Sequence, residues 1–239
     1  MPEVIERCSN SSYNDEMNTL SKIKISGKDA FDFLQNQLTN DLRHLKLMPK
    51  IMAAWCNPKG RVIWVGEVSK TQSSFEILVP TNLAENIVQR FLTFRFRAKV
   101  KFNIIDENKT EKLAGLISKG FPFIGLEQTE KYTPHMLNLD LINAVDFNKG
   151  CYPGQEVVAR THYKGLSKRR TFKFESESRI NVNDKVICNG QKVGNVLNVY
   201  ENNLLAIIPV KMAAKELAVG NSRLKLDRLP YFDEKIDLI

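Results

Sequence analysis

The residues best suited to chemistry lie in one stretch, FNKGCYPGQEVVARTHYKGLSKRR, which runs from Phe147 to Arg170. Gly150 and Gly154 flank Cys151 in this stretch, and glycines permit the positive φ values and close backbone approaches of a tight bend. The following residues, GQEVVARTHY, predict a helix that ends at Gly165. A helix N-terminus and the nearby Lys149 would both favour the thiolate of Cys151. The pattern leaves two interpretations open, a reactive thiol and a small cysteine packed beneath a turn.

Two common cysteine chemistries are disfavoured by what accompanies the thiol. A cysteine nucleophile of the hydrolase type needs a histidine base, and His162 stands eleven residues further along the same predicted helix. A zinc knuckle needs paired cysteines. The four cysteines, Cys8, Cys56, Cys151 and Cys188, are far apart in the sequence. We therefore expect no intrinsic metal site and a reducing compartment.

Charged side chains follow the bend. Glu156 and Arg160 are four residues apart, so they could pair on one helix face. Alternatively, Glu156 could face a ligand, because a carboxylate can accept two parallel hydrogen bonds from a donor edge such as that of a pterin. No acid occurs from Val157 to Phe174, whereas this span holds several cations: Arg160, Lys164, Lys168, Arg169, Arg170 and Lys173. This run predicts either a solvated face or a site for an anion, such as RNA phosphate or a carboxylate tail.

The elements that must position these residues are mixed. Alternating patterns predict strands in LSKIKISG, in IMAAWC and RVIWVGEV around the turn Asn57–Gly60, in SSFEILVP and in AKVKFNIID. Helical spacing predicts one helix over 27–45, broken near Thr39, and another in TNLAENIVQRFLTF. After about residue 167 only short strands follow, with a hairpin signal at Asn189-Gly190. The chain is therefore expected to combine an α+β domain with a small C-terminal β-barrel.

The bulk properties allow several partners. The chain has 239 residues and a formal net charge of +8, which favours anionic partners without choosing among them. No apolar run reaches the ~20 residues of a membrane helix, and residues 1–16 do not resemble a secretory signal. We expect no membrane partner, a cytoplasmic location and a mobile segment at 1–16.

The motif KGCYPGQEVVART, Lys149–Thr161, resembles the signature of the YgfZ family, which are folate-binding relatives of the glycine cleavage T-protein. Further segments are similar to that family: ISGKDAFDFLQNQLTNDL, CNPKGRVI and TPHMLNLDLINAVDFNKGC. The resemblance implies a T-protein-like folate-binding domain over 17–168 and a C-terminal barrel over 169–239. It also implies support of iron–sulfur cluster assembly or repair for enzymes such as those that thiolate tRNA.

The same resemblance assigns residues. It implies a functional thiol at Cys151 with Lys149 beside it, and a signature loop that includes Gly150, Tyr152 and Gly154. It implies tetrahydrofolate or a derivative as cofactor, and it places the folate contacts at Asn40, Asp41, Gln155 and Glu156. Arg160, Lys168, Arg169 and Arg170 are the expected contacts for a folate tail or tRNA. Partners would be folate and iron–sulfur client enzymes or assembly proteins, with Cys151 as a transient ligand of a shared cluster, since one cysteine cannot hold a cluster alone.

Two alternatives remain. A tetrahydrofolate-dependent one-carbon transferase is disfavoured because Trp64 and Val65 stand where the T-proteins carry catalytic acids. An RNA-binding module would use the basic run at 160–173. Whether the protein is an enzyme is therefore left open.

Overall fold

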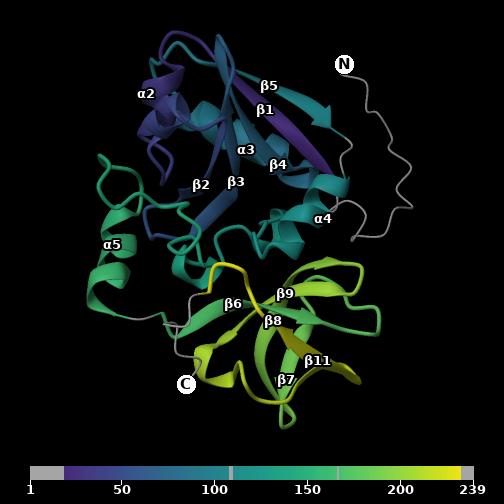
Figure 1. The fold of residues 1–239 in the computed structure, drawn as a ribbon. Coiled ribbons are helices and arrows are strands. Elements are labelled where there is room, and N and C mark those ends of the chain that lie inside the picture. Colours follow the sequence, from purple (N-terminus) through teal and green to yellow (C-terminus); the bar gives the residue numbers. More distant parts are fainter. Residues whose placement is uncertain (1–18, 108–109, 166, 233–239) are drawn as a thin grey trace.

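The computed structural model describes residues 19–107, 110–165 and 167–232. The segment expected to be mobile, residues 1–16, lies outside the described residues. Figure 1 shows the sheet in the upper half of the molecule and the barrel in the lower half, with α5 (Gln155–Lys164) at the left of both. The expected combination of an α+β part and a C-terminal barrel is confirmed.

The first part is a five-stranded antiparallel sheet in the order β2-β3-β4-β1-β5. Its strands follow the alternating patterns of the sequence, and a tight turn at Asn57–Gly60 joins β2 to β3. The strands are β1 (Leu20–Ser26), β2 (Lys50–Cys56), β3 (Val62–Lys70), β4 (Ser74–Pro80) and β5 (Lys101–Glu107).

Helices cover one face of this sheet. Leu83, Ile87 and Phe91 of α3 (Thr81–Phe94) are buried there, as the helical spacing predicts. The helix expected over 27–45 is much shorter: α2 (Ala30–Gln35) ends early, and a 3₁₀ turn η1 (Leu42–Lys46) follows. The break lies ahead of the predicted one because Leu38 forms a β-bridge with Trp55.

Short elements connect β5 to β6 along the chain: α4 (Thr110–Ser118), the 3₁₀ turns η2 (Leu126–Gln128) and η3 (His135–Leu137), and α5 (Gln155–Lys164). Helix α5 has the expected span, with Gly165 at its C-terminal end. Helix α4 is not among the elements that the sequence pattern predicts.

The barrel is closed, with the strand order β10-β11-β6-β9-β8-β7. Asn189 and Gly190 both have positive φ, 48° and 75°, which is the conformation that a two-residue hairpin turn requires. The strands are β6 (Arg169–Glu175), β7 (Lys185–Cys188), β8 (Gln191–Tyr200), β9 (Asn203–Pro209), β10 (Leu217–Val219) and β11 (Ser222–Asp227), with the 3₁₀ turn η4 (Val210–Met212) before β10.

Two hydrophobic clusters follow from this arrangement. One lies between the sheet and its covering helices, and it includes Trp55 and Phe91. The other joins the opposite face of the sheet to the barrel interior, and it includes Ala54, Val65 and Phe172. The predicted boundary at 168/169 coincides with the start of β6, but whether the two parts are separate domains stays a prediction.

Candidate functional site

A cavity of about 840 Å³ lies on the face of the sheet that is turned toward the connecting segments. A volume of this size is in the range of small-molecule sites, roughly 300–1,000 Å³. The lining combines apolar side chains with a few charged ones: Asn40, His44, Met48, Lys50, Ile51, Met52, Glu67, Leu116, Lys119, Phe121, Ile142, Asn143, Val145, Asp146, Phe147, Asn148, His162 and Tyr163.

The segment Thr39–Asp41 holds one wall of the cavity in place. Asn40 Nδ2 donates to the carbonyls of Met52 and Asn143, each at 2.7 Å, and Asn40 Oδ1 accepts from the Asp41 amide. Thr39 Oγ1 donates to the Ala144 carbonyl and accepts from the Ala54 amide. This segment therefore ties strand β2 to a loop more than a hundred residues later in the chain.

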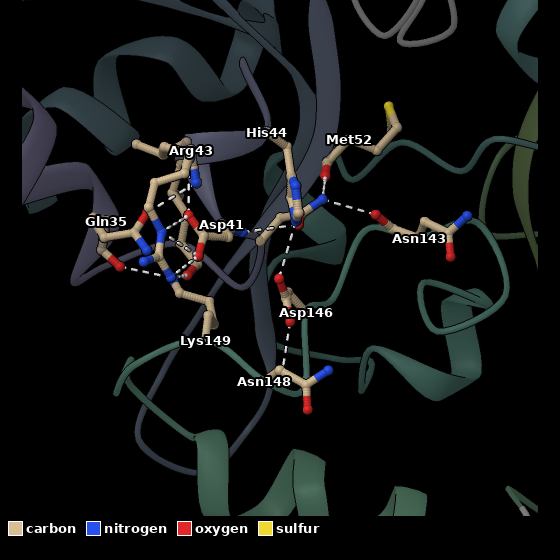
Figure 2. Close-up of polar contacts among 12 residues, drawn as sticks. Gln35, Asp41, Arg43, His44, Met52, Asn143, Asp146, Asn148 and Lys149 are labelled. Carbon is tan, nitrogen blue, oxygen red and sulfur yellow. Dashed lines mark hydrogen bonds and ion pairs between the residues drawn. The ribbon is translucent and has the colours of Figure 1, made fainter. Parts of the chain in front are cut away.

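Asp41 points away from the cavity and into a local ion pair. Its carboxylate accepts from the amide of Arg43 at 2.8 Å and from the guanidinium of the same residue, as Figure 2 shows. These bonds from Arg43 hold the pKa of the Asp41 carboxyl well below its usual range. The role of Asp41 in the described structure is to begin η1, and it does not line the cavity.

Two pairs of ionisable side chains lie on the cavity wall. Glu67 of β3 is buried, 7% exposed, and its Oε1 pairs with the ammonium of Lys50 on the neighbouring strand. His44 Nε2 lies 3.1 Å from Asp146 Oδ2, and Asp146 Oδ1 accepts from the Asn148 amide (Figure 2). The cavity thus contains a carboxyl group beside a lysine and an imidazole beside a second carboxyl group.

Aromatic rings form another part of the wall. Phe147 and His162 stack with ring centroids 3.7 Å apart and planes 15° apart. Tyr163 meets His162 edge to face at 4.9 Å. His162, which the sequence offered only as a distant base for Cys151, is therefore a cavity residue.

Lys149 is buried under the cysteine loop. Its Nζ donates to the carbonyls of Gln35, at 2.6 Å, and Leu38, and it lies 5.3 Å from the ring centroid of Tyr152. Burial lowers the pKa of Lys149 to about 8. The ammonium makes no hydrogen bond to the Cys151 sulfur within the described residues, so its contacts are those of a structural brace.

The cysteine loop rests on the turn between β2 and β3. Gly154 has a φ of 81°, and a Cβ there would lie 2.4 Å from the Asn57 carbonyl oxygen. Gly60 has a φ of 68°, and a Cβ there would lie 2.9 Å from the Cβ of Val157. Gly150 lacks the positive φ that was expected of it, and the space around it is open. Cys151 is exposed as a free thiol.

The signature residues that follow lie outside the cavity. Gln155 Oε1 accepts from the Tyr152 amide at 3.2 Å, and Tyr152 itself is buried, which raises the pKa of its hydroxyl. Glu156 and Arg160 are exposed, and the structure shows no ion pair between them in the part of the chain that it describes. Of the predicted folate contacts, Asn40 lines the cavity, whereas Asp41, Gln155 and Glu156 do not.

The basic run is divided by the fold. Arg170 is buried and forms a bidentate pair with Asp140, at 3.0 and 2.9 Å, so its guanidinium is already paired within the fold, and its contact with a folate tail or RNA stays a prediction. Arg169 donates to the Val193 carbonyl. Arg160 and Lys168 remain exposed.

We call Asn40, Lys149 and Arg170 the inner set, because each is buried with its polar atoms bonded to other parts of the fold. We call Cys151, Glu156 and Arg160 the outer set, because each is exposed and its side chain has no hydrogen bond or ion pair among the described residues.

The sequence reasoning did not assign His44, Glu67, Asp146 or His162 to the site. The sequence does single out Glu67, since it is the one acid within the apolar strand VIWVGEV. A charged side chain in a buried strand is stable only when it is paired or binds a ligand. The others carry no local signal, because separate segments bring them together.

Several known proteins are similar to this chain in sequence, and a solved structure is similar in fold. No protein-family model matches the chain. An uncharacterized protein of Haemophilus influenzae is 26% identical over 264 residues, which cover 87% of this chain and 94% of that protein. The tRNA-modifying protein YgfZ of Colwellia psychrerythraea is 27% identical over 233 residues, covering 69% and 72% of the two chains. Its namesake in Buchnera aphidicola is 35% identical over 102 residues, which cover 40% of this chain.

A solved structure shares the fold. The glycine cleavage system aminomethyltransferase T from Bartonella henselae superimposes with a TM-score of 0.67, at 14% identity, over 89% of this chain and 84% of that one. The expected T-protein-like fold is therefore confirmed. Among the described residues, no helix is long and apolar enough to cross a membrane.

Proposed function

This chain is a member of the YgfZ family with an aminomethyltransferase-like fold, and on that premise we propose that it binds a folate and supports iron–sulfur enzymes of the tRNA-modification kind through the thiol of Cys151. The observation that carries the folate part is the cavity of about 840 Å³ with a buried carboxylate on its wall. The thiol part rests on the exposure of Cys151 in the signature loop.

The cavity residues fit the chemistry of a reduced folate. The amino-pyrimidine edge of a pterin presents parallel N–H donors, and a carboxylate is the matching acceptor. Glu67 is a buried acidic residue on the cavity wall, and it pairs with the ammonium of Lys50. We assign the pterin contact to Glu67, in place of Glu156.

The rest of a folate also finds suitable neighbours. An aromatic ring can pack against the stacked Phe147 and His162. A carboxylate tail is attracted by the ammonium group of Lys119, which lines the cavity. When bound, a tetrahydrofolate would supply the capacity to carry a one-carbon unit.

Cys151 would act together with a partner protein. Within the described ranges, no group of three or more His, Cys, Asp and Glu side chains could hold a metal ion, and a cluster needs several ligands. The loop that carries Cys151 packs tightly against the turn Asn57–Gly60. A thiol that is exposed on such a fixed loop can bind a cluster transiently when a partner protein supplies the other ligands.

Titration of the purified protein with tetrahydrofolate tests the cavity assignment. We expect the wild-type chain to bind, Glu67→Gln to bind at least about tenfold more weakly, because it leaves charge-assisted bonds unmade, and Glu156→Gln to match the wild type. If Glu156→Gln loses binding instead, the assignment to Glu67 is wrong. If the wild type binds no reduced folate, the proposal that this protein binds folate is wrong.

Complementation tests the thiol. In a strain that lacks this gene, Cys151→Ala should fail to restore the activity of iron–sulfur enzymes that thiolate tRNA, whereas Cys188→Ala should restore it, since Cys188 is buried in the barrel. Full restoration by Cys151→Ala would contradict the proposal.

One observation favours a second function, a tetrahydrofolate-dependent one-carbon transferase. Trp64 and Val65 replace the acids of the T-proteins, but Glu67 and the His44–Asp146 pair place acidic and basic groups in the cavity. Such groups can move protons to or from a bound amine. Folate-dependent release of formaldehyde from an amine substrate, lost in His44→Gln, would support this second function, and its absence in the wild type would exclude it.

A further inference from the structure

The segment Phe94–Lys101, FRFRAKVK, lies on the other side of the sheet from the cavity, where α3 ends. Within it, Phe96 is 85% exposed and has a φ of +46°. A bulky residue with a positive φ is strained, and an exposed phenyl ring gains nothing from burial. In the free protein neither property stabilises the fold, so both need another explanation.

The segment is well anchored, so its exposure is not a result of looseness. Phe91, just before the segment, and Val100, within it, are both buried. The Lys99 amide donates to Asp29 Oδ2 at 2.7 Å, and the Ala98 amide donates to the Arg95 carbonyl at 2.9 Å. A fixed backbone therefore holds the ring of Phe96 in solvent.

The charge around this ring has one sign. No acid occurs in the sequence between Glu85 and Asp106, while Arg95, Arg97, Lys99 and Lys101 surround Phe96. Among the described residues, none of these four cations has an ion pair; Arg95 donates to the Val100 carbonyl. Asp29 is the nearby acid, and the Lys99 amide occupies one of its oxygens.

We propose that residues 94–101 form a binding site for single-stranded RNA, in which a base stacks on Phe96 while Arg97, Lys99 and Lys101 contact phosphates. Stacking on exposed aromatic rings together with backbone contacts from cations is how proteins bind unpaired strands. Bases in a duplex stack on one another and are not available to such a ring. The carboxylates of an acidic protein partner would pair with the cations, but they would not stack on the phenyl ring of Phe96.

A series of contacts links this segment to the base of the cysteine loop. Phe94 contacts Trp55 edge to face, with ring centroids 5.9 Å apart. The backbone of Trp55 forms a β-bridge with Leu38, whose carbonyl accepts from the ammonium of Lys149.

Fluorescence anisotropy of a labelled twelve-nucleotide oligouridine with the full chain tests the proposal. Phe96→Gly removes the ring and suits the positive φ, so this variant should fold at least as well as the wild type. We expect it to bind the oligouridine about tenfold more weakly, the magnitude of one lost stacking contact. In the double variant Arg97→Gln/Lys99→Gln, the slope of the logarithm of the binding constant against the logarithm of the salt concentration should become shallower by about 0.7 per removed cation.

A matched control removes two cations from the barrel. Lys185→Gln/Lys192→Gln changes two exposed lysines of β7 and β8, and it should leave the oligouridine affinity at a given salt nearly unchanged. The proposal is overturned if the wild type does not bind at low salt, if Phe96→Gly binds as well as the wild type, or if the control loses more affinity. It is also overturned if a labelled polyglutamate peptide or duplex RNA binds as tightly as the oligouridine. None of these measurements involves folate, so they are independent of the proposed cavity function.

Discussion

The inner and outer sets come from the same segments of sequence but do opposite things in the fold. Lys149 and Cys151 are two residues apart, yet Lys149 is buried with its ammonium on two carbonyls, whereas Cys151 is exposed. Arg160 and Arg170 differ in the same way, one free in solvent and one locked to Asp140. A single motif can therefore contain both buried residues that hold the fold together and exposed residues that are free to react or bind. The residue type alone does not distinguish the two.

The largest effect on stability is expected at Arg170. Arg170→Met should lower the free energy of unfolding by about 3–5 kcal/mol, because it leaves Asp140 buried and unpaired. The matched outer-set variant, Arg160→Met, should change it by less than about 0.5 kcal/mol. Urea unfolding followed by circular dichroism measures both.

The double variant Arg170→Met/Asp140→Leu separates pairing from packing. It should recover much of the loss, since an apolar pair of similar volume can replace a buried ion pair. Equal losses in Arg160→Met and Arg170→Met would remove the distinction between the two sets.

Gly154 and Gly150 sharpen the comparison within the loop itself. Gly154→Ala should cost about 2–4 kcal/mol, because a Cβ would lie 2.4 Å from the Asn57 carbonyl oxygen at a φ of 81°. Gly150→Ala has open space around it and should be neutral within about 1 kcal/mol. Thermal unfolding of the two variants tests this; a larger loss in Gly150→Ala would contradict the interlocked turns.

Alkaline pH tests the burial of Lys149. Its folded pKa of about 8 is below the usual 10.5, so between these values the unfolded chain binds more protons at this site, and the contribution of Lys149 to stability rises with pH. The wild type should therefore gain on the order of 2 kcal/mol relative to Lys149→Met as the pH increases from 7.5 to 10.

Cys56 acts in the opposite direction over part of this range. Burial raises its pKa from 9 to about 12, so the unfolded chain loses this proton first and stability falls above pH 9. Because both chains contain Cys56, the difference between wild type and Lys149→Met isolates the lysine. If the difference in the free energy of unfolding between the two chains does not change with pH, the pKa of Lys149 is not lowered in the folded protein.

The smallest effect on stability is expected at Cys151. Cys151→Ser should leave the free energy of unfolding unchanged within about 0.5 kcal/mol. In a Cys8→Ser background, native protein should react with an aromatic disulfide at Cys151 first, because Cys56 and Cys188 are buried. Fast labelling that persists in Cys151→Ser would show that another thiol is the accessible one.

Much of the fold follows from local pattern. Strands β2 and β3 with their turn, helix α3 and the hairpin at Asn189-Gly190 lie where alternation, helical spacing and turn residues predict them. The predicted helix over 27–45 was too long, because Leu38 and Thr39 pair with Trp55 and Ala54 instead of continuing the helix. Tertiary contacts outweighed helical spacing at this point.

The site divides along the same line. By itself the sequence determined that Cys151 sits in a glycine-bounded bend at a helix start, because φ preferences and capping act between neighbours. It could not determine that Glu67 lines the cavity whereas Glu156 does not, or that Arg170 is buried. Those outcomes depend on contacts such as that between Asn40 and Asn143, which are 103 residues apart. Only the packing of the sheet against the connecting loops decides which polar groups lose water and which keep it.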